Sequence, residues 1–276
     1  MIRADLHLHT LCSDGAYSPE EIARRVKEAG VSLFSVTDHD NMEGVERAGR
    51  AAKKEGLLFV RGMEISAYND FGKVHVLGYC CGQNSAYERF LKERTEGAYL
   101  RADDSRQKAN AYFGTNLTMD DVEEFHLQKN APLHTMHVVG AFAKALQRGK
   151  IELYRFLFAY GKPAYSGLCR PTPEDAIKII HDMGGRAVLA HPAQINAKGK
   201  ALKGLLDELT AAGLDGIECY HTTHTVIESA NFAAYAKEKK LLITGGSDFH
   251  SDGTERVLGL PEFYASDELL QAFSLA

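Results

Sequence analysis

The sequence predicts an α/β barrel of about seven β/α units, interrupted by a helical insertion. Short apolar runs alternate with helical patterns in the first third of the chain and again after residue 171. Such alternation is typical of βαβ units around a parallel sheet. Between residues 85 and 160 the strand signal disappears and the pattern becomes charged and helical. Residues 1–84 and 161–276 are therefore predicted to form the barrel domain, and residues 85–160 the insertion.

In the first third, cap and turn residues mark where the elements begin and end. Ser18 is a typical N-cap, Pro19 suits the first helical position, and Gly30 ends that helix. Gly56 ends the next helix in the same way. The predicted elements are strand 2–9, a helix from 19 to 29, strand 31–37, helix 41–55 and strands 57–65 and 74–79.

The insertion contains Thr118 as the cap of one predicted helix. We expect the insertion to lie beside the barrel, as a lid over the active site. Its aromatic residues are expected to form a small core of their own, and the alternative is a platform for stacking nucleobases. These aromatic residues are Tyr99, Tyr112, Phe113, Phe125, Tyr154, Phe156 and Phe158.

The alternation of strands and helices resumes at Thr172-Pro173, which begins a helix that ends at Gly184. The remaining predicted elements are strand 187–190, helix 202–212, strand 216–220, helix 227–239 and strand 241–244. In barrels of this kind, the active site lies at the carboxyl ends of the strands. The residues found at those ends therefore carry the functional prediction.

The composition limits the classes of function. With 276 residues, 45% of them hydrophobic, the chain is long enough to bury a sizeable core. Its net charge of −5 provides no general attraction for nucleic acid, so stable binding of duplexes is not expected. Five cysteines without Cys-x-x-Cys spacing argue against a disulfide framework. Neither a secretory signal nor a membrane-spanning run is apparent, so we expect a cytoplasmic protein.

Residues that commonly bind metal ions occur where the predicted strands end. They are His7, His9, Asp14, His39, Glu64, His75, His191, Asp248 and His250. Because residues two apart in a strand face the same side, His7 and His9 can both point into the barrel mouth. Asp248 and His250 have the same relation if that strand end stays extended.

These nine residues combine imidazole nitrogens with carboxylates. Such a mixed set suits Zn²⁺, Mn²⁺ or Fe²⁺ better than Mg²⁺ or Ca²⁺, which prefer oxygen ligands alone. Nine ligands exceed the needs of a single ion, so two or three divalent ions are predicted.

Each motif by itself also has a structural interpretation. Asp40 or Asn41 could cap the helix that follows, Glu64 could be a surface acid, and His191 before Pro192 could only end a strand. The metal-binding interpretation is favoured because all the motifs converge on one end of one sheet.

In combination, the motifs resemble the PHP (polymerase and histidinol phosphatase) family. The resemblance rests on Asp5-x-His7-x-His9-Thr10-x-x-Ser13-Asp14-Gly15, Thr37-Asp38-His39-Asp40, Gly62-x-Glu64, His75 in Val-His-x-Leu-Gly, Ala190-His191-Pro192 and Gly245-Gly246-Ser247-Asp248-x-His250, in this order. It implies a distorted (β/α)7 barrel with up to three metal ions at the carboxyl ends of its strands.

The resemblance also implies how the ligands are shared. One ion would take His7, His9, Glu64 and Asp248; a second Glu64, His75 and His191; a third Asp14, His39 and His250. Several family members have a histidine where Asp14 stands, and an aspartate there favours harder metals. Glu64 would bridge the first two ions.

Within the family, the pattern is most similar to bacterial phosphoesterases that remove the 3′-phosphate of nucleoside 3′,5′-bisphosphates or trim short RNA from its 5′ end. A small phosphorylated substrate, a nucleotide, is therefore expected. This branch commonly has Arg-Pro-His in the insertion, whereas this chain has Leu133-His134-Thr135-Met136-His137. We expect His134, His137 and Arg170 to contact the substrate.

The implied reaction is hydrolysis of a phosphomonoester by a metal-activated water. His221 and His224 are the candidate general acids, with exposed loop histidines as the alternative. Glu218 and Asp38 are candidates for orienting the metal ligands. Two other functions stay open: hydrolysis of histidinol phosphate or another small metabolite, and a degenerate metal-binding scaffold without activity.

Overall fold

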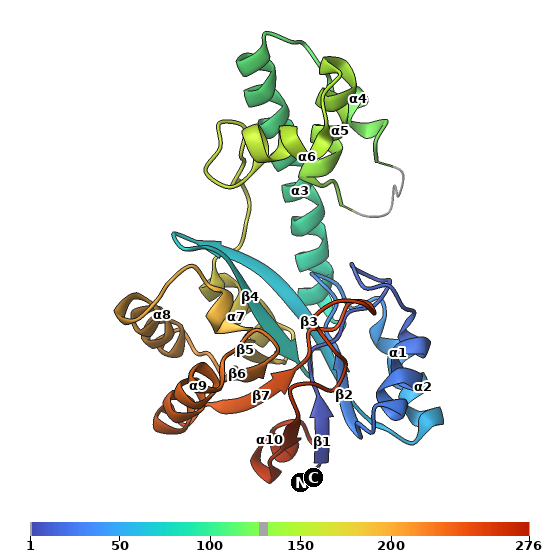
Figure 1. Cartoon of the computed structure of the whole chain (residues 1–276), viewed down its shortest axis with the longest axis vertical. Coiled ribbons are helices and arrows are strands. Elements are labelled where there is room, and N and C mark those ends of the chain that lie inside the picture. Colours follow the sequence, from blue (N-terminus) through green and yellow to red (C-terminus); the bar gives the residue numbers. More distant parts are fainter. Residues whose placement is uncertain (1, 127–131, 276) are drawn as a thin grey trace. The chain divides into compact units, whose positions relative to one another are not determined.

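The computed structural model describes residues 2–126 and 132–275, in two compact units. The first unit contains the residues up to Tyr87 and those from Pro171 on, and the second contains Glu88–Arg170 (Figure 1). The second unit extends past the predicted boundary at residue 160 because residues 165–169 return to pack along its long helix. There, Arg101 donates hydrogen bonds to the carbonyl oxygens of Leu168 and Cys169, at 3.2 and 2.9 Å.

The described residues of the first unit form an eight-stranded sheet in the order β7-β6-β5-β4-β3-β2-β1-β8. The strands are β1 (Ile2–Asp5), β2 (Leu33–Val36), β3 (Leu58–Asn69), β4 (Gly72–Tyr79), β5 (Arg186–Leu189), β6 (Gly216–His221), β7 (Leu242–Gly246) and β8 (Phe263–Ala265). The sheet curls into a nearly closed barrel, which confirms the predicted fold class.

The expectation of an entirely parallel sheet is wrong for two strands. β4 runs antiparallel to both β3 and β5, and β8 runs antiparallel to β1. Only residues 70 and 71 separate β3 from β4, and a parallel pair would need a crossover of a dozen or more residues. β3 is also longer than predicted, so Glu64 lies within the strand and not at its end.

The barrel closes between the residues that follow β1 and those at the end of β7 and just after it. The amide of Leu6 donates to the carbonyl oxygen of Gly245 at 3.1 Å, and the amide of His9 donates to that of Phe249 at 3.1 Å. The predicted strand 2–9 is therefore shorter in the structure: β1 ends at Asp5 after pairing with β2 and β8, and residues 6–9 close the barrel through hydrogen bonds to β7 and the segment after it.

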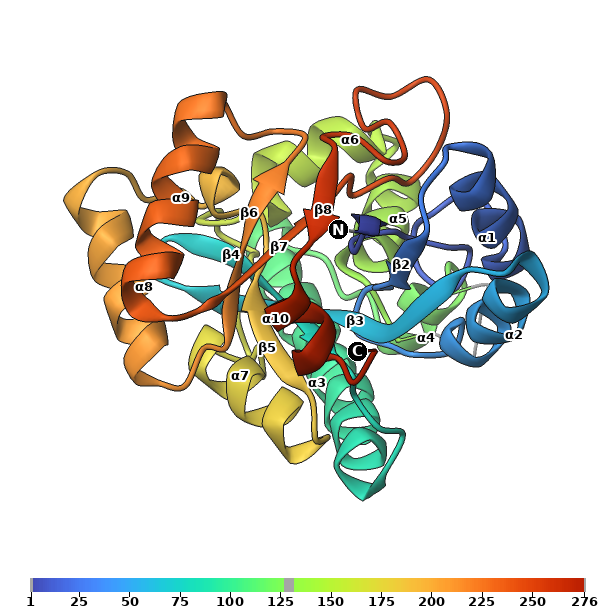
Figure 2. The same cartoon turned by 90° about the horizontal axis from the view of Figure 1, so that it is seen from below.

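Helices cover the outside of the barrel: α1 (Pro19–Glu28) and α2 (Val45–Glu55) flank one side, and α7 (Pro173–Asp182), α8 (Lys200–Ala211) and α9 (Val226–Lys239) the other (Figure 2). The short η2 (Pro192–Gln194) and α10 (Asp267–Ala272) complete this unit. Ser18 and Thr172 cap α1 and α7 as predicted, each side chain accepting a backbone hydrogen bond from the first turn.

The second unit is helical among its described residues. It contains most of α3 (Ser85–Phe113), then α4 (Met119–Glu123), α5 (Thr135–Leu146), α6 (Lys150–Leu153) and a π-helical turn, η1 (Tyr154–Phe158). Phe158 is buried in its core and Phe113 and Phe125 pack against that core, as expected, whereas Tyr112 and Phe156 are exposed. In the described parts of the chain, no helix is both long and apolar enough to span a bilayer.

We expect Gly246→Ala to destabilise the barrel, because Gly246 lies at the closure. A β-carbon there would lie 2.4 Å from the Cβ of His7 and 2.6 Å from its backbone nitrogen, so the closing strand would have to move. Overpacking of this kind costs ~1–3 kcal/mol. Urea unfolding followed by circular dichroism measures the change in the free energy of unfolding.

Gly204→Ala is the matched control for this experiment. Gly204 lies within helix α8, and no atom lies within 4 Å of the added carbon. This exchange should stabilise the protein by ~0.5–1 kcal/mol through helix propensity. Equal stability of the two variants would contradict the tight closure at Gly246.

Candidate metal centre

The nine predicted ligands converge on one end of the barrel. Most follow a parallel strand: His7, His9 and Asp14 come after β1, His39 after β2, His191 after β5, and Asp248 and His250 after β7. Glu64 lies within β3, and His75 lies near the beginning of β4. Because β4 is antiparallel, its beginning lies beside the carboxyl ends of the parallel strands, and this places His75 in the same cluster.

The carboxylate of Glu64 lies at the centre of the cluster and is 1% exposed. Among the described residues, five imidazoles surround it. Its Oε1 lies 2.7 Å from His75 Nδ1, 3.1 Å from His191 Nε2 and 3.4 Å from His7 Nε2, and its Oε2 lies 3.0 Å from His39 Nδ1 and 3.3 Å from His9 Nε2. A carboxylate in this position can serve two neighbouring cations through its two oxygens.

Asp248 joins the first pair of histidines. Its Oδ1 lies 3.2 Å from His9 Nε2 and 3.4 Å from His7 Nε2, so His7 and His9 do face the same group. Asp248 and His250 were expected to face the same side only if the backbone stays extended after β7. It does not, because Asp248 has a φ of 54°. This turn, not strand alternation, directs Asp248 and His250 to adjacent parts of the cluster.

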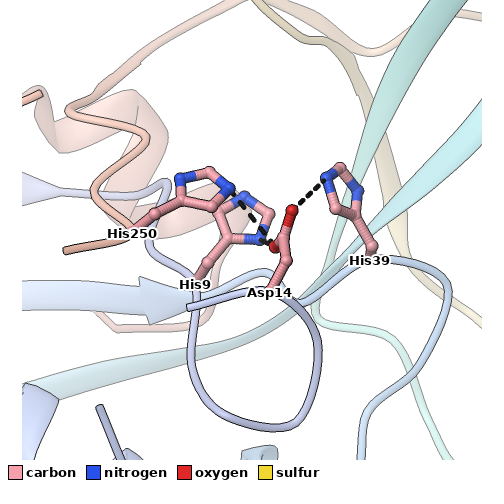
Figure 3. Close-up of side chains that lie close together, drawn as sticks. All are labelled: His9, Asp14, His39 and His250. Atoms are coloured by element: carbon pink, nitrogen blue, oxygen red, sulfur yellow. Dashed lines mark ion pairs between the residues drawn. The ribbon is translucent and has the colours of Figure 1, made fainter. Parts of the chain in front are cut away.

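Asp14 forms a second group with His9, His39 and His250, and Figure 3 shows its carboxylate between these rings. Its Oδ1 lies 3.3 Å from His9 Nδ1 and 3.3 Å from His250 Nε2, while Oδ2 lies 3.7 Å from His39 Nε2. Asp14 is carried by a loop and its side chain is half exposed, whereas Glu64 and Asp248 are buried.

Several buried polar atoms of the cluster lack a hydrogen bond to any described residue. They include His7 Nε2, His9 Nε2, His39 Nδ1, His75 Nε2, His191 Nδ1 and Glu64 Oε2. Buried polar groups in proteins are nearly always satisfied. Atoms of the type that binds transition metals, left unsatisfied in a buried cluster of imidazoles and a carboxylate, fit a site built for cations.

The sets of potential ligands that lie close together in the structure differ slightly from the sets implied by the resemblance to the PHP family. Sets with ligand atoms within 4.8 Å of one another include His7, His9 and Glu64; His7, His191 and Asp248; His39, Glu64 and His75; and His9, Asp14, His39 and His250. His191 thus also lies with the Asp248 group, and His39 is shared between the Glu64 and Asp14 groups.

The electrostatics of the cluster are those of carboxylates held among imidazoles. Burial lowers the pKa of His7, but Glu218, Glu64 and Asp248 outweigh it and raise that pKa well above the usual value. Burial raises the pKa of Asp248, yet His7 and other neighbours bring it far below the usual range. The neighbouring carboxylates thus favour the protonated form of His7. Because histidine binds a metal ion only in its deprotonated form, a divalent cation would replace that proton.

Three further carboxylates hold the ligands in place. Glu218 Oε1 lies 3.0 Å from His7 Nδ1, and its Oε2 accepts a hydrogen bond from the His191 amide at 2.7 Å. Asp38 accepts hydrogen bonds from Thr10 and Ser13, and Asp5 accepts them from Ser247 and Gly259. Asp38 therefore anchors the loop that carries Asp14 through Thr10 and Ser13, and within the described residues its side chain makes no hydrogen bond to the ring of the neighbouring His39.

The cluster opens into a cavity of about 330 Å³. It is lined by Asp14, His39, Glu64, Lys73, His75, His191, Gln194, Ile195, Asp248, His250 and Arg256. The two cations in this lining, Lys73 and Arg256, are not among the residues predicted from the sequence. Arg256 Nη1 lies 2.9 Å from Asp248 Oδ2 and 3.2 Å from His250 Nδ1. Lys73 precedes His75 by two residues and Arg256 follows His250 by six, so their closeness to these potential ligands in the sequence could have predicted them.

The two candidate general acids lie behind the ligands. His221 is 1% exposed, which excludes the alternative of an exposed loop histidine for this residue. Its Nε2 lies 3.4 Å from Asp248 Oδ2, and it groups with His7 and Glu218. His224 donates from Nδ1 to the carbonyl oxygen of Cys219 at 3.1 Å. Neither imidazole lines the cavity.

The predicted substrate residues belong to the second unit. The amide of His134, at the N-cap of α5, donates to His137 Nδ1 at 3.0 Å. Arg170 lies over the ring of Tyr165, with 5.6 Å between its guanidinium carbon and the ring centroid. Their contacts with a substrate stay a prediction, because they are described only within their own unit.

Comparison with known proteins identifies a matching family model and relatives that align over most of this chain and most of their own length. Residues 5–161 match the model of the PHP domain. The 3′,5′-nucleoside bisphosphate phosphatase of Chromobacterium violaceum is 31% identical and aligns over 92% of this chain and 89% of its own. The 5′-3′ exoribonuclease of Haemophilus influenzae is also 31% identical, over 89% of each. Phosphoribosyl 1,2-cyclic phosphate 1,2-diphosphodiesterase of Eggerthella lenta is 30% identical, over 89% and 93%.

Two solved structures have the same fold. An amidohydrolase from C. violaceum, with bound sulfate and no metal, superposes with a TM-score of 0.73 at 28% identity, over 98% of this chain and 96% of that one. A candidate metal-dependent phosphoesterase from Bifidobacterium adolescentis superposes with a TM-score of 0.71 at 25% identity, over 98% and 94%.

We expect Glu218→Gln to weaken metal binding ~10–100-fold, the usual effect of losing such an outer carboxylate. The amide keeps the shape of Glu218 but removes the charge that pairs with His7 Nδ1. Competition with a chromophoric chelator measures the affinity for Mn²⁺ and Zn²⁺. Glu208→Gln, at an exposed position on α8, is the control. Unchanged affinity in Glu218→Gln would show that this contact does not support the metal ligands.

Proposed function

This chain belongs to the PHP domain family and is a metal-dependent phosphoesterase, and we propose that it removes the 3′-phosphate from nucleoside 3′,5′-bisphosphates. We further propose that it acts on the 5′ ends of short RNA. The observation that carries the proposal is the carboxylate-centred cluster that opens, beside two cationic side chains, into a cavity of about 330 Å³. This volume lies at the small end of the usual range for ligand pockets.

We propose that two or three divalent ions bind here. His7, His9, Glu64 and Asp248 would hold one ion, Glu64 with His75 and His191 a second, and Asp14 with His39 and His250 a third. Mixed nitrogen and oxygen ligands support Mn²⁺, Zn²⁺ or Fe²⁺. When bound, such ions supply Lewis acidity that activates water and offsets the charge of a phosphoryl group.

The chain's own residues prepare the site for a phosphate. Two divalent ions would outweigh the charges of Asp14, Glu64 and Asp248, so the loaded site would be positive and attract a dianion. Arg256 keeps the carboxylate of Asp248 turned toward the cluster through its contact with Oδ2. Its Nη2 and Nε form no hydrogen bond with the described residues, so they remain available for a phosphate oxygen.

A proton must reach the departing alkoxide in this reaction. His221 and His224 stay our candidates, and His221 is the better supported because it lies beside Asp248. Since neither ring lines the cavity, a water molecule would have to carry the proton from either ring to the substrate.

The relatives support a phosphorylated nucleotide or sugar as the substrate. Two are named for nucleoside bisphosphates and RNA, and the third for a phosphoribosyl cyclic phosphate. Histidinol phosphate is less well supported, because none of these three relatives is named for it. An inactive scaffold is not supported, because all nine potential ligands are present and clustered.

Turnover of a substrate panel with Mn²⁺ tests the proposal. We expect adenosine 3′,5′-bisphosphate to be hydrolysed with the highest kcat/KM, and a short 5′-phosphorylated RNA more slowly. Histidinol phosphate and phosphoribosyl 1,2-cyclic phosphate complete the panel. Preferred turnover of either of these would replace the proposed substrate while leaving the metal-dependent chemistry in place.

We expect His9→Ala and Asp248→Ala to abolish hydrolysis, because His9 belongs to two of the ligand sets and Asp248 is the carboxylate that both His7 and His9 face. Metal analysis should show reduced occupancy, and the far-UV circular dichroism should stay largely unchanged. Stripping the native protein with a chelator should also remove activity, which Mn²⁺ or Zn²⁺ restores.

The exposed His181, which pairs with Asp215 away from the cavity, provides the control. His181→Ala should keep near-normal turnover and metal content. Near-normal turnover in His9→Ala, or full recovery of stripped protein with Ca²⁺ alone, would contradict the proposed ligand chemistry.

A further inference from the structure

Lys73 lies at the beginning of β4, two residues before the potential ligand His75. Residues two apart in a strand point to the same face, so the side chain of Lys73 shares the cavity face with that of His75. Lys73 indeed lines the same cavity. Two residues along a strand advance ~7 Å, which places Lys73 beyond the ligand cluster, toward the β3–β4 turn.

The ammonium of Lys73 forms no hydrogen bond or ion pair with the residues that the structure describes. Arg256, the other cation lining the cavity, differs because it pairs with Asp248. A cation that faces a cavity without a partner in the protein is suited to bind an anion from solution.

The surrounding unit would not attract a second anion by its general field. Residues 1–87 and 171–276 contain 19 Lys and Arg against 27 Asp and Glu. The excess of carboxylates in this unit would repel a phosphate that lies away from the metal ions. Such a phosphate therefore needs a cationic side chain close by. Among the cavity-lining residues, Lys73 is the cation that is not already paired with a carboxylate.

We propose that Lys73 binds the second, non-reacting phosphate of the substrate, while the reacting phosphate occupies the metal cluster beside Arg256. This inference rests on the proposed function, because it requires a substrate with two phosphate groups. Lys73 is thus a specificity-determining residue: it favours bisphosphates over monophosphates and does not take part in the chemical step.

The test compares two substrates that differ only in the second phosphate. Kinetic constants for adenosine 3′,5′-bisphosphate and adenosine 3′-phosphate are measured with Mn²⁺-loaded wild type, Lys73→Gln and Lys73→Arg. Lys73→Gln should lower kcat/KM for the bisphosphate by about tenfold or more, mainly through KM, as expected for a lost charge-assisted contact. Turnover of the monophosphate should change less than twofold, and Lys73→Arg should retain most of the preference.

Lys54→Gln is the matched control, since Lys54 is an exposed lysine on α2 that does not line the cavity. Thermal unfolding and Mn²⁺ content should be the same in all variants. An equal loss for both substrates would show that Lys73 serves the reacting phosphate or the metal ligands, and no loss for either would show that it binds neither. Both outcomes overturn the proposal.

A binding measurement separates this proposal from the proposed function. Calorimetry with adenosine 5′-phosphate, which keeps only the non-reacting phosphate, should show at least tenfold weaker binding to Lys73→Gln, with the affinity for inorganic phosphate unchanged. If wild type hydrolyses neither substrate, the proposed function fails, and this binding difference still decides the role of Lys73. Equal binding of adenosine 5′-phosphate by wild type and variant would refute it.

Discussion

The rest of the barrel is organised around one buried carboxylate, that of Glu64. A single acid in a strand interior would be costly to bury, and burial by itself raises its pKa. Imidazoles from β4 and from the segments after β1, β2 and β5 surround Glu64, and His75 and His39 contribute most to lowering its pKa again. The segments after the strands thus converge on one polar centre, whose nitrogen and oxygen atoms are of the kinds that bind metal ions.

The direction of β4 decides what reaches this centre. In a wholly parallel barrel, the beginning of a strand lies at the opposite end from the active site. The two-residue turn after β3 reverses β4, so His75 lies beside Glu64 and Lys73 lies at the outer part of the same cavity. One reversed strand therefore adds both a potential metal ligand and a cation for substrate.

Six acids in and behind the cluster divide into two kinds by their place. Glu64, Asp248 and Asp14 line the cavity, meet imidazole rings and are available to cations. Asp5, Asp38 and Glu218 do not line it; they accept hydrogen bonds from backbone amides and hydroxyls, and Glu218 also contacts His7 Nδ1, so that these three acids fix the segments that carry the potential ligands. Such support keeps ligands in the geometry that a metal requires before the metal arrives.

Residue types and short spacings were enough to predict the fold class, the helix caps and the nine potential ligands, because caps and strand-end motifs are local in the chain. His7 and His9, for example, face one carboxylate because alternation along a strand needs no distant partner. The reversal of β4, the turn at Asp248 and the positions of Arg256 and Lys73 depend on which strands pair. Pairing is set by contacts between residues far apart in sequence, and only the folded barrel specifies those.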